Sequence, residues 1–289
     1  MDKSFAEYRD DAHSWITLAT GEFYPDILPL AQELYKPVLV TFGQILKKSH
    51  SSKNLFEGIN EISETWMRVQ LCRVFRKYVS PATPVEMLKQ KRKAPDIIHQ
   101  FGDSFRPINE VAAAFASRPL DDEALSAVLW EYKDRGKSGY DLTQQAFTII
   151  RENLGEYVAS GPERAGRDII LGELFTNYPK PDRPIDLLIK DSDGNVAAIG
   201  LARYDGDRGG AQEDDRTGQY REVADELIRY FDSAGLPKAK VFFINDGPGL
   251  LLGSMWSDYS HIDEMHEGRV RVMTLRMIPI RLTSEWLQD

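Results

Sequence analysis

The sequence predicts an α/β fold in which helices flank a mixed β-sheet and a helical part comes first in the chain. Residues 1 to about 160 carry apolar side chains at the three- and four-residue spacing of amphipathic helices. After Gly161-Pro162, short apolar runs bounded by turn residues predict strands around one amphipathic helix. Helices followed by strands indicate a mainly helical domain over 1–160 and an α/β domain over 161–289.

The expected elements of the second half follow one another without long gaps. Alternation and turn chemistry predict an antiparallel hairpin, and one apolar stripe predicts a helix that ends at Gly235. In order, we expect a helix over 163–176, strands over 185–189 and 196–203 joined by a turn, a polar glycine-rich loop over 204–218, that helix, and strands over 240–245 and 270–275.

Composition narrows the class of protein. The 289 residues are 42% hydrophobic and 28% charged, which excludes wholesale disorder and suits a globular protein. No apolar run approaches the ~20 residues of a membrane helix, and the start lacks the order of a signal peptide. A single cysteine, Cys72, excludes an internal disulfide and indicates a buried core thiol. We therefore expect a cytoplasmic protein with no membrane partner.

Charge is distributed unevenly along the chain. The net charge is −9, yet the stretch from Trp66 to Pro95 holds eight basic residues against one acid, and 269–281 holds four arginines and no acid. Such stretches can bind phosphate on a protein that is acidic overall. Lys91 and Arg92 are the candidates for contacts to DNA phosphates. The alternative is that residues 89–93 are only a solvated helix end.

Carboxylates gather around the expected hairpin. Asp186 stands near the start of its first strand, and Glu173 on the preceding helix could approach the same point. Neighbouring carboxylates are costly unless a cation neutralises them, and all-oxygen ligation suits Mg²⁺. Asp186 and Glu173 are therefore the first candidates for metal ligands and catalysis. Glu213 is a further candidate ligand, and Asp205 a further catalytic candidate.

The order of these elements resembles the PD-(D/E)xK nuclease superfamily, and within it the type II restriction endonucleases. The resemblance covers about residues 163–245 and rests on Pro-Asp-Arg-Pro-Ile-Asp186, the strand Ala-Ala-Ile-Gly-Leu-Ala-Arg203, the following helix and the strand ending at Asn245. It implies a restriction-endonuclease-like sheet core and an endonuclease that needs Mg²⁺ and acts on double-stranded DNA.

The chain departs from this superfamily at one point. The acid and the lysine that the second strand of the family presents would fall on Gly200 and Ala202. Three explanations are open. Glu173, Asp205 or Glu213 supplies the carboxylate and Arg203 the positive charge; or one of the small residues is a substitution that silences the enzyme; or only the fold is shared.

The segment from Arg203 to Gly218 combines arginines, carboxylates, Gln212 and glycines. Arginine reads guanine in the major groove, glutamine can read adenine, and an acid can accept from cytosine. The alternative is a solvated loop. The expected base-reading residues are Arg203, Asp207, Arg208, Gln212, Asp214 and Arg216.

These observations favour a type II restriction endonuclease that works as a homodimer, because one candidate site per chain must serve two DNA strands. The segment 206–210 lacks the Lys-Ser/Thr of a phosphate-binding loop, so we expect no nucleotide cofactor. The alternatives are a non-catalytic DNA-binding protein that retains a nuclease fold, and an acidic interaction protein with no role in nucleic-acid binding. The recognition sequence and cut position do not follow from the sequence.

Overall fold

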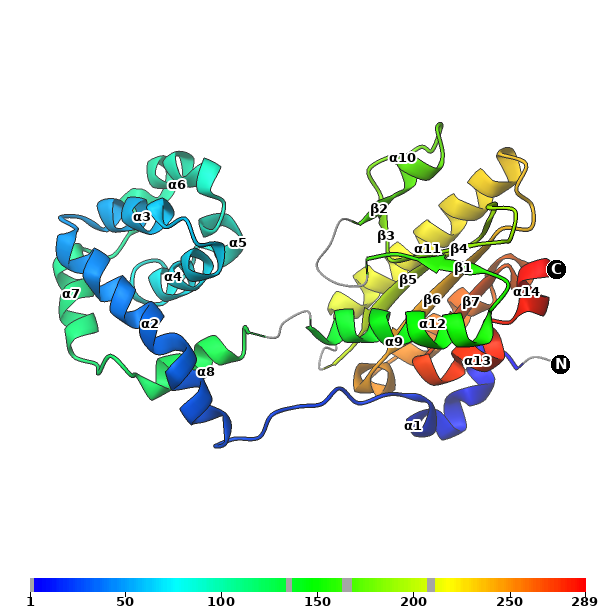
Figure 1. Cartoon of the computed structure of the whole chain (residues 1–289), viewed down its shortest axis with the longest axis horizontal. Coiled ribbons are helices and arrows are strands. Elements are labelled where there is room, and N and C mark those ends of the chain that lie inside the picture. Colours follow the sequence, from blue (N-terminus) through cyan, green and yellow to red (C-terminus); the bar gives the residue numbers. More distant parts are fainter. Residues whose placement is uncertain (1–2, 134–136, 163–167, 207–210) are drawn as a thin grey trace. The chain divides into compact units, whose positions relative to one another are not determined.

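A computed structural model describes the chain except residues 1–2, 134–136, 163–167 and 207–210, and without the side chains of 137–140 and 211–216. The chain forms two compact units. One comprises residues 1–20 and 136–289, and the other comprises residues 21–135. Figure 1 shows the chain leaving the first unit after α1 and returning to it at α9.

Residues 21–135 are helical, as predicted. Ser51, Glu64 and Asp122 cap three of the helices by accepting hydrogen bonds from backbone N–H groups in the first turn. A separate hydrophobic core fills this unit, and Cys72 is fully buried within it, as expected. The α-helices are α2 (Ile27–Lys48), α3 (Ser52–Glu61), α4 (Thr65–Tyr78), α5 (Val85–Leu88), α6 (Ala94–Phe101), α7 (Ile108–Ala116) and α8 (Glu123–Trp130); η2 (Lys91–Lys93) and η3 (Gly102–Ser104) are 3₁₀ turns.

The domain boundary differs from the one expected at residue 160. The first 20 residues and α9 (Lys137–Asn153) belong to the α/β unit. Helical periodicity could not reveal this, because it records the element type and not the core that the apolar face joins. Phe5 and Tyr8 of η1 (Phe5–Asp11) and Ala12 of α1 (Ala12–Trp15) are buried in the same core as the sheet.

The sheet of this unit has five strands in the order β1-β4-β5-β6-β7. The pairs β1–β4 and β4–β5 are antiparallel, whereas β5–β6 and β6–β7 are parallel, so the predicted mixed sheet and hairpin are confirmed. Sequence patterning missed the three-residue β1. The bounds are β1 (Val158–Ser160), β4 (Leu187–Lys190), β5 (Val196–Tyr204), β6 (Lys240–Asp246) and β7 (Val270–Met273).

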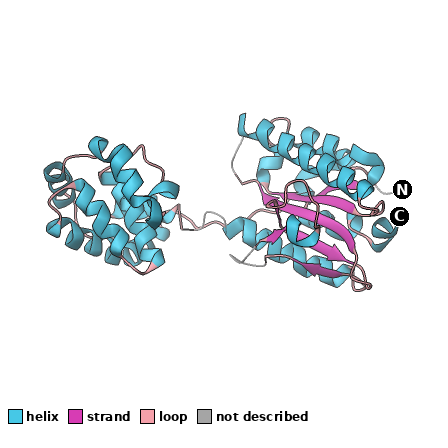
Figure 2. Cartoon of the chain, turned by 90° about the horizontal axis from the view of Figure 1, so that it is seen from above, coloured by secondary structure: helices cyan, strands magenta, loops and turns pink. Residues whose placement is uncertain are grey.

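Helices lie on both faces of this sheet (Figure 2). The crossover from β5 to β6 runs through α11 (Ala211–Ser233), where Tyr220 stacks on Phe243 of β6 with ring centroids 4.6 Å apart. The helix thus covers the sheet face to which Phe243 belongs. It also begins inside the segment predicted to be a loop over 204–218. The other helices are α12 (Met255–Asp263), α13 (Ile278–Arg281) and α14 (Ser284–Gln288), with 3₁₀ turns η4 (Pro248–Leu251), η5 (Met265–Gly268) and η6 (Leu275–Met277).

Of the helix predicted over 163–176, the described part is helical only over residues 171–174. Residues 169–170 form β2 (Ile169–Ile170), which pairs with β3 (Pro184–Ile185) in a separate two-stranded ribbon. Only α10 (Leu171–Leu174) is helical. The N–H groups of Leu171 and Gly172 donate to the carbonyls of Arg183 and Pro181, so cross-chain hydrogen bonds replace helical ones. Among the described residues, no helix is both long and apolar enough to cross a bilayer.

Candidate functional site

Asp186 lies between β3 and β4, at the point where the chain passes from the ribbon to the main sheet. Its Oδ2 accepts a hydrogen bond of 2.9 Å from the backbone N–H of Ala202 on β5. The backbone of Gly161 packs directly against Asp186, and only glycine fits there because a Cβ would lie 2.1 Å from the carbonyl oxygen of Asp186. The side chain is thus fixed at the end of the hairpin, as the sequence predicted.

A second carboxylate that the sequence reasoning missed faces Asp186. The register of the ribbon pairs Ile169 with Ile185, so Asp168 and Asp186 are the next residues just beyond the paired ends of β2 and β3. Burial raises the pKa of Asp186, the N–H of Ala202 lowers it, and the charge of Asp168 raises it further. Like charges at facing positions repel unless a cation lies between them. Only the pairing of β2 with β3 shows this proximity.

Glu173 does not take the place expected for it. It is exposed on α10, and it is absent from the charges that affect the pKa of Asp186. Its expected approach depended on a longer helix, whereas β2 occupies residues 169–170 and Glu173 lies on the four-residue α10. Asp168 is therefore a better partner for Asp186 than Glu173.

Gly200 and Ala202 share one face of β5, and Leu201 and Arg203 share the other, because successive strand residues alternate. A Cβ at Gly200 would lie 2.3 Å from the ring of Phe242, which is fully buried. An acidic side chain at position 200 would therefore have to displace a core aromatic ring. This geometry argues against the explanation that Gly200 replaces a catalytic acid.

Arg203 and Asp205 form an ion pair at the end of β5. Arg203 Nε donates to Asp205 Oδ1 at 2.8 Å, and the Tyr259 hydroxyl on α12 lies 3.5 Å from Asp205 Oδ2. Asp205 is 2% exposed and its backbone oxygen accepts from the N–H of Gly249. The sequence predicts a catalytic role for Asp205, and that role stays a prediction. In the structure its buried carboxylate accepts from the Nε of Arg203.

Asp246, at the end of β6, is fully buried and accepts from three backbone N–H groups. Thr17 and Gly247 donate to its Oδ1 at 2.6 Å each, and Leu275 donates to its Oδ2 at 3.0 Å. Burial raises the pKa of this carboxyl, although the three backbone donors and the side chain of Thr17 lower it. Both oxygens are thus used in attaching the N-terminal segment and the segment after β7 to the sheet.

The remaining candidates for DNA contacts are only partly described. Asp207 and Arg208 lie outside the described residues, and so do the side chains of Gln212, Glu213, Asp214 and Arg216, whose backbone belongs to α11. Lys91 and Arg92 are exposed on η2 of the helical unit.

The four arginines over 269–281 have protein partners, which weakens their expected role as phosphate contacts. Arg281 is 2% exposed and pairs with Asp263, and Arg269 pairs with Asp232. Arg271 and Arg276 donate to the backbone oxygens of Arg281 and Ser14. This stretch therefore holds the α/β unit together.

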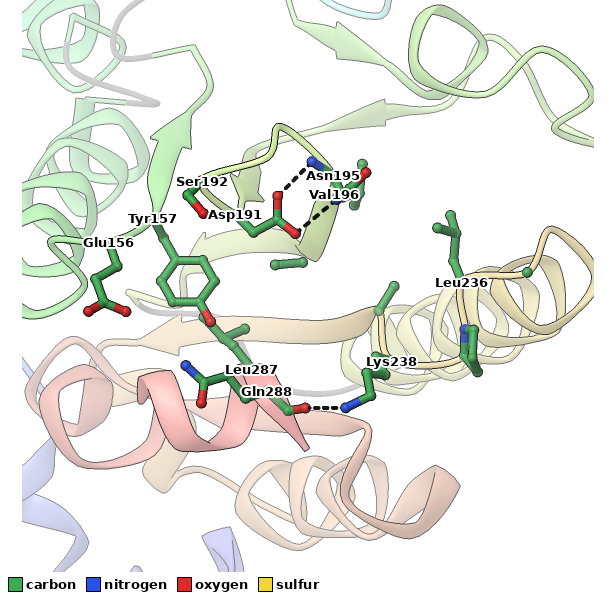
Figure 3. A pocket seen from close by; sticks show the side chains of 14 residues that line it. Glu156, Tyr157, Asp191, Ser192, Asn195, Val196, Leu236, Lys238, Leu287 and Gln288 are labelled. Carbon is green, nitrogen blue, oxygen red and sulfur yellow. Dashed lines mark hydrogen bonds between the residues drawn. The ribbon is translucent and has the colours of Figure 1, made fainter.

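A pocket of about 630 Å³ lies at the opposite end of β4 and β5 from Asp186 (Figure 3). Asp191 within it accepts from the backbone and side-chain nitrogens of Asn195, and Lys238 donates to the backbone oxygen of Gln288. The Asp191 carboxylate thus stabilises the turn between β4 and β5, and the Lys238 ammonium group contacts the C-terminal helix. None of the predicted site residues lines it.

The described residues contain no group of three or more histidine, cysteine, aspartate or glutamate side chains placed to hold a metal ion. His266 contacts Asp225 at 2.7 Å. No family model, curated protein or solved structure matches the chain. Inferences about function therefore depend on the site and on the resemblance of its element order to a nuclease core.

Proposed function

We propose that the chain is an endonuclease of the type II restriction class, which hydrolyses phosphodiester bonds of double-stranded DNA with Mg²⁺ and works as a homodimer. The observation that carries the proposal is the pair of facing carboxylates, Asp168 and Asp186, at the mouth of the hairpin. An antiparallel hairpin, a crossover helix and a parallel strand follow Asp186, in the order of the nuclease core that the sequence resembles.

These residues fit a hydrated divalent cation. Two carboxylates are enough for Mg²⁺, which keeps several waters and binds few protein ligands. Asp186 Oδ2 already accepts from the N–H of Ala202. A cation would relieve the repulsion between the charges of Asp168 and Asp186. When bound, such an ion supplies an activated water and neutralises charge on the phosphate. Asp186 and Asp168 would hold it, with Asp168 in place of the expected Glu173; the side chain of Glu213 lies outside the described residues.

Arg203 takes the part of the lysine that is missing from position 202. Its Nε is held by Asp205, and its two terminal nitrogens have no hydrogen-bond partner among the described residues. A guanidinium presented in this way can stabilise the negative charge that grows on a phosphate during hydrolysis. Asp205 orients this group without itself touching the substrate.

The two units differ in net charge, and the difference suits DNA contacts by the helical unit. Residues 21–135 hold 16 basic and 15 acidic residues, whereas the rest of the chain holds 20 basic and 30 acidic residues. The near-neutral helical unit, with Lys91 and Arg92 exposed, can therefore approach DNA with less repulsion than the α/β unit.

Incubation of the purified protein with mixed plasmid DNA and Mg²⁺ tests the proposal. Discrete fragments with defined ends support a site-specific endonuclease. Retarded but intact DNA would instead favour a non-catalytic DNA-binding protein, which the absence of an acid and a lysine at Gly200 and Ala202 also suggests. If the DNA is neither cut nor retarded, the result would mean that the chain does not act on nucleic acid. Light scattering with and without cognate DNA tests the dimer.

A further inference from the structure

Arg203 is the next-to-last residue of β5, and one nitrogen of its guanidinium is bound by a neighbouring carboxylate. Its side chain is 30% exposed, and its one hydrogen bond, from Nε to Asp205, fixes the plane of the guanidinium. Asp205, 1% exposed at its side chain, is itself held near the Tyr259 hydroxyl. The terminal nitrogens of Arg203 remain available, because no described residue accepts from them.

Asn245 lies beside Arg203 on the neighbouring strand. The two are Cα partners in the parallel β5–β6 ladder, so their side chains leave the same face of the sheet. Asn245 is fully buried, and neither its amide nitrogen nor its amide oxygen has a hydrogen-bond partner. Within the described part of the chain, no other residue has two such atoms. Burial of an unsatisfied amide costs free energy, and such groups often mark a functional site.

We propose that Arg203 and Asn245 form one oxyanion-binding subsite, with Asp205 and Tyr259 as positioning residues. The guanidinium and the amide NH₂ both donate, and they come from the ends of adjacent parallel strands. Donors from two strands can bind two oxygens of one phosphate group. The identification of the anion as a DNA phosphate rests on the proposed function, whereas the existence of the subsite does not.

A purely structural role for Asn245 makes the opposite prediction about stability. If the Asn245 side chain contributed hydrogen bonds to folding, the protein would lose stability when leucine, which has a similar shape, replaced it. If the amide serves a ligand, the protein should instead gain stability, because leucine removes the unsatisfied buried atoms. Stability and anion binding should therefore change in opposite directions in Asn245→Leu.

Inorganic phosphate is the probe. Thermal denaturation of the full chain measures its effect on stability, and calorimetry measures its affinity. We expect phosphate to raise the melting temperature of the wild type. Asn245→Leu should melt higher than the wild type without phosphate and bind phosphate at least about ten-fold more weakly. Arg203→Gln should lose binding similarly, and Asn245→Asp should lose it through repulsion. Arg221→Gln removes an exposed arginine of α11 and should bind phosphate as the wild type does.

Tyr259→Phe separates positioning from direct contact. It leaves Arg203 and Asn245 in place, so phosphate should still bind, with affinity reduced about two- to five-fold as the guanidinium loses its fixed plane. Absence of phosphate binding by the wild type, or wild-type affinity in Asn245→Leu, would overturn the subsite. Failure of the protein to cut DNA while phosphate binding follows these expectations would instead remove only the proposed function.

Discussion

Asp186 and Asp246 are two carboxylates of one sheet, at the start of β4 and the end of β6, and burial raises the pKa of both. They differ in their partners. Asp246 accepts from three backbone N–H groups, and two of these come from segments distant in sequence. Asp186 accepts from one, and faces another acid. Two aspartates of one sheet thus have different environments: Asp246 is fully buried and joins distant segments, whereas Asp186 is half-buried and has one backbone donor beside a second acid.

Asp186→Asn should produce the largest change. It removes a metal ligand and the repulsion with Asp168, so DNA cleavage in Mg²⁺ should fall by about 100-fold or more while the free energy of unfolding stays equal or rises. Fragment yield over time and urea denaturation measure the two quantities. Asp193→Asn, in the exposed turn between β4 and β5, is the control and should change neither. A stable protein is essential to the comparison, since an unfolded variant would show nothing about catalysis.

Asp246→Asn should show the opposite pattern. The amide NH₂ would face a backbone donor, either Leu275 or the pair Thr17 and Gly247, so one buried N–H group loses its acceptor. We expect a loss of about 1–3 kcal/mol in the free energy of unfolding, measured by urea denaturation. Cleavage per folded molecule should be unchanged. A loss of cleavage with stability intact would mean that the two carboxylates have exchanged roles.

The pH dependence of stability sharpens the same contrast. Because burial raises the pKa of Asp246 in the folded state, the folded protein holds that proton more tightly than the unfolded chain does. The contribution of this carboxyl is therefore fully present below the ordinary aspartate pKa of about 3.9, and it declines as pH rises through the raised folded pKa. The stability difference between wild type and Asp246→Asn should narrow over that range. Denaturation at several pH values measures it, and a difference that widens with pH would contradict the assignment.

Asp168→Asn and Glu173→Gln form a matched pair with the smallest expected effects. Asp168 faces Asp186, so its replacement should reduce cleavage about ten-fold and weaken the dependence on Mg²⁺. Glu173 is exposed on α10, and its replacement should change cleavage by less than about two-fold. Equal rates for the two variants would show that the ribbon does not bring Asp168 into the site.

The sequence predicted the hairpin, the crossover helix and the place of Asp186 at the start of the hairpin, because alternation and turn residues are local signals. It could not predict Asp168, whose place depends on the pairing of β2 with β3 and not on its own neighbours. It could not predict the partners of Asp246 either, since Thr17 lies 229 residues away. Spacing also directed attention to Gly200 and Ala202, whereas alternation puts Arg203 on the other face of the strand.

The position of a divalent cation tests the central claim most directly. Crystals of the protein with cognate DNA, grown with Mn²⁺ in place of Mg²⁺, would reveal the ion by its anomalous scattering. We predict one Mn²⁺ ion per chain, with an oxygen of Asp186 and an oxygen of Asp168 both at about 2.0–2.2 Å, close to the distances of Mg²⁺ ligands. Mn²⁺ bound elsewhere on the chain, with Asp168 and Asp186 both free of it, would contradict the account.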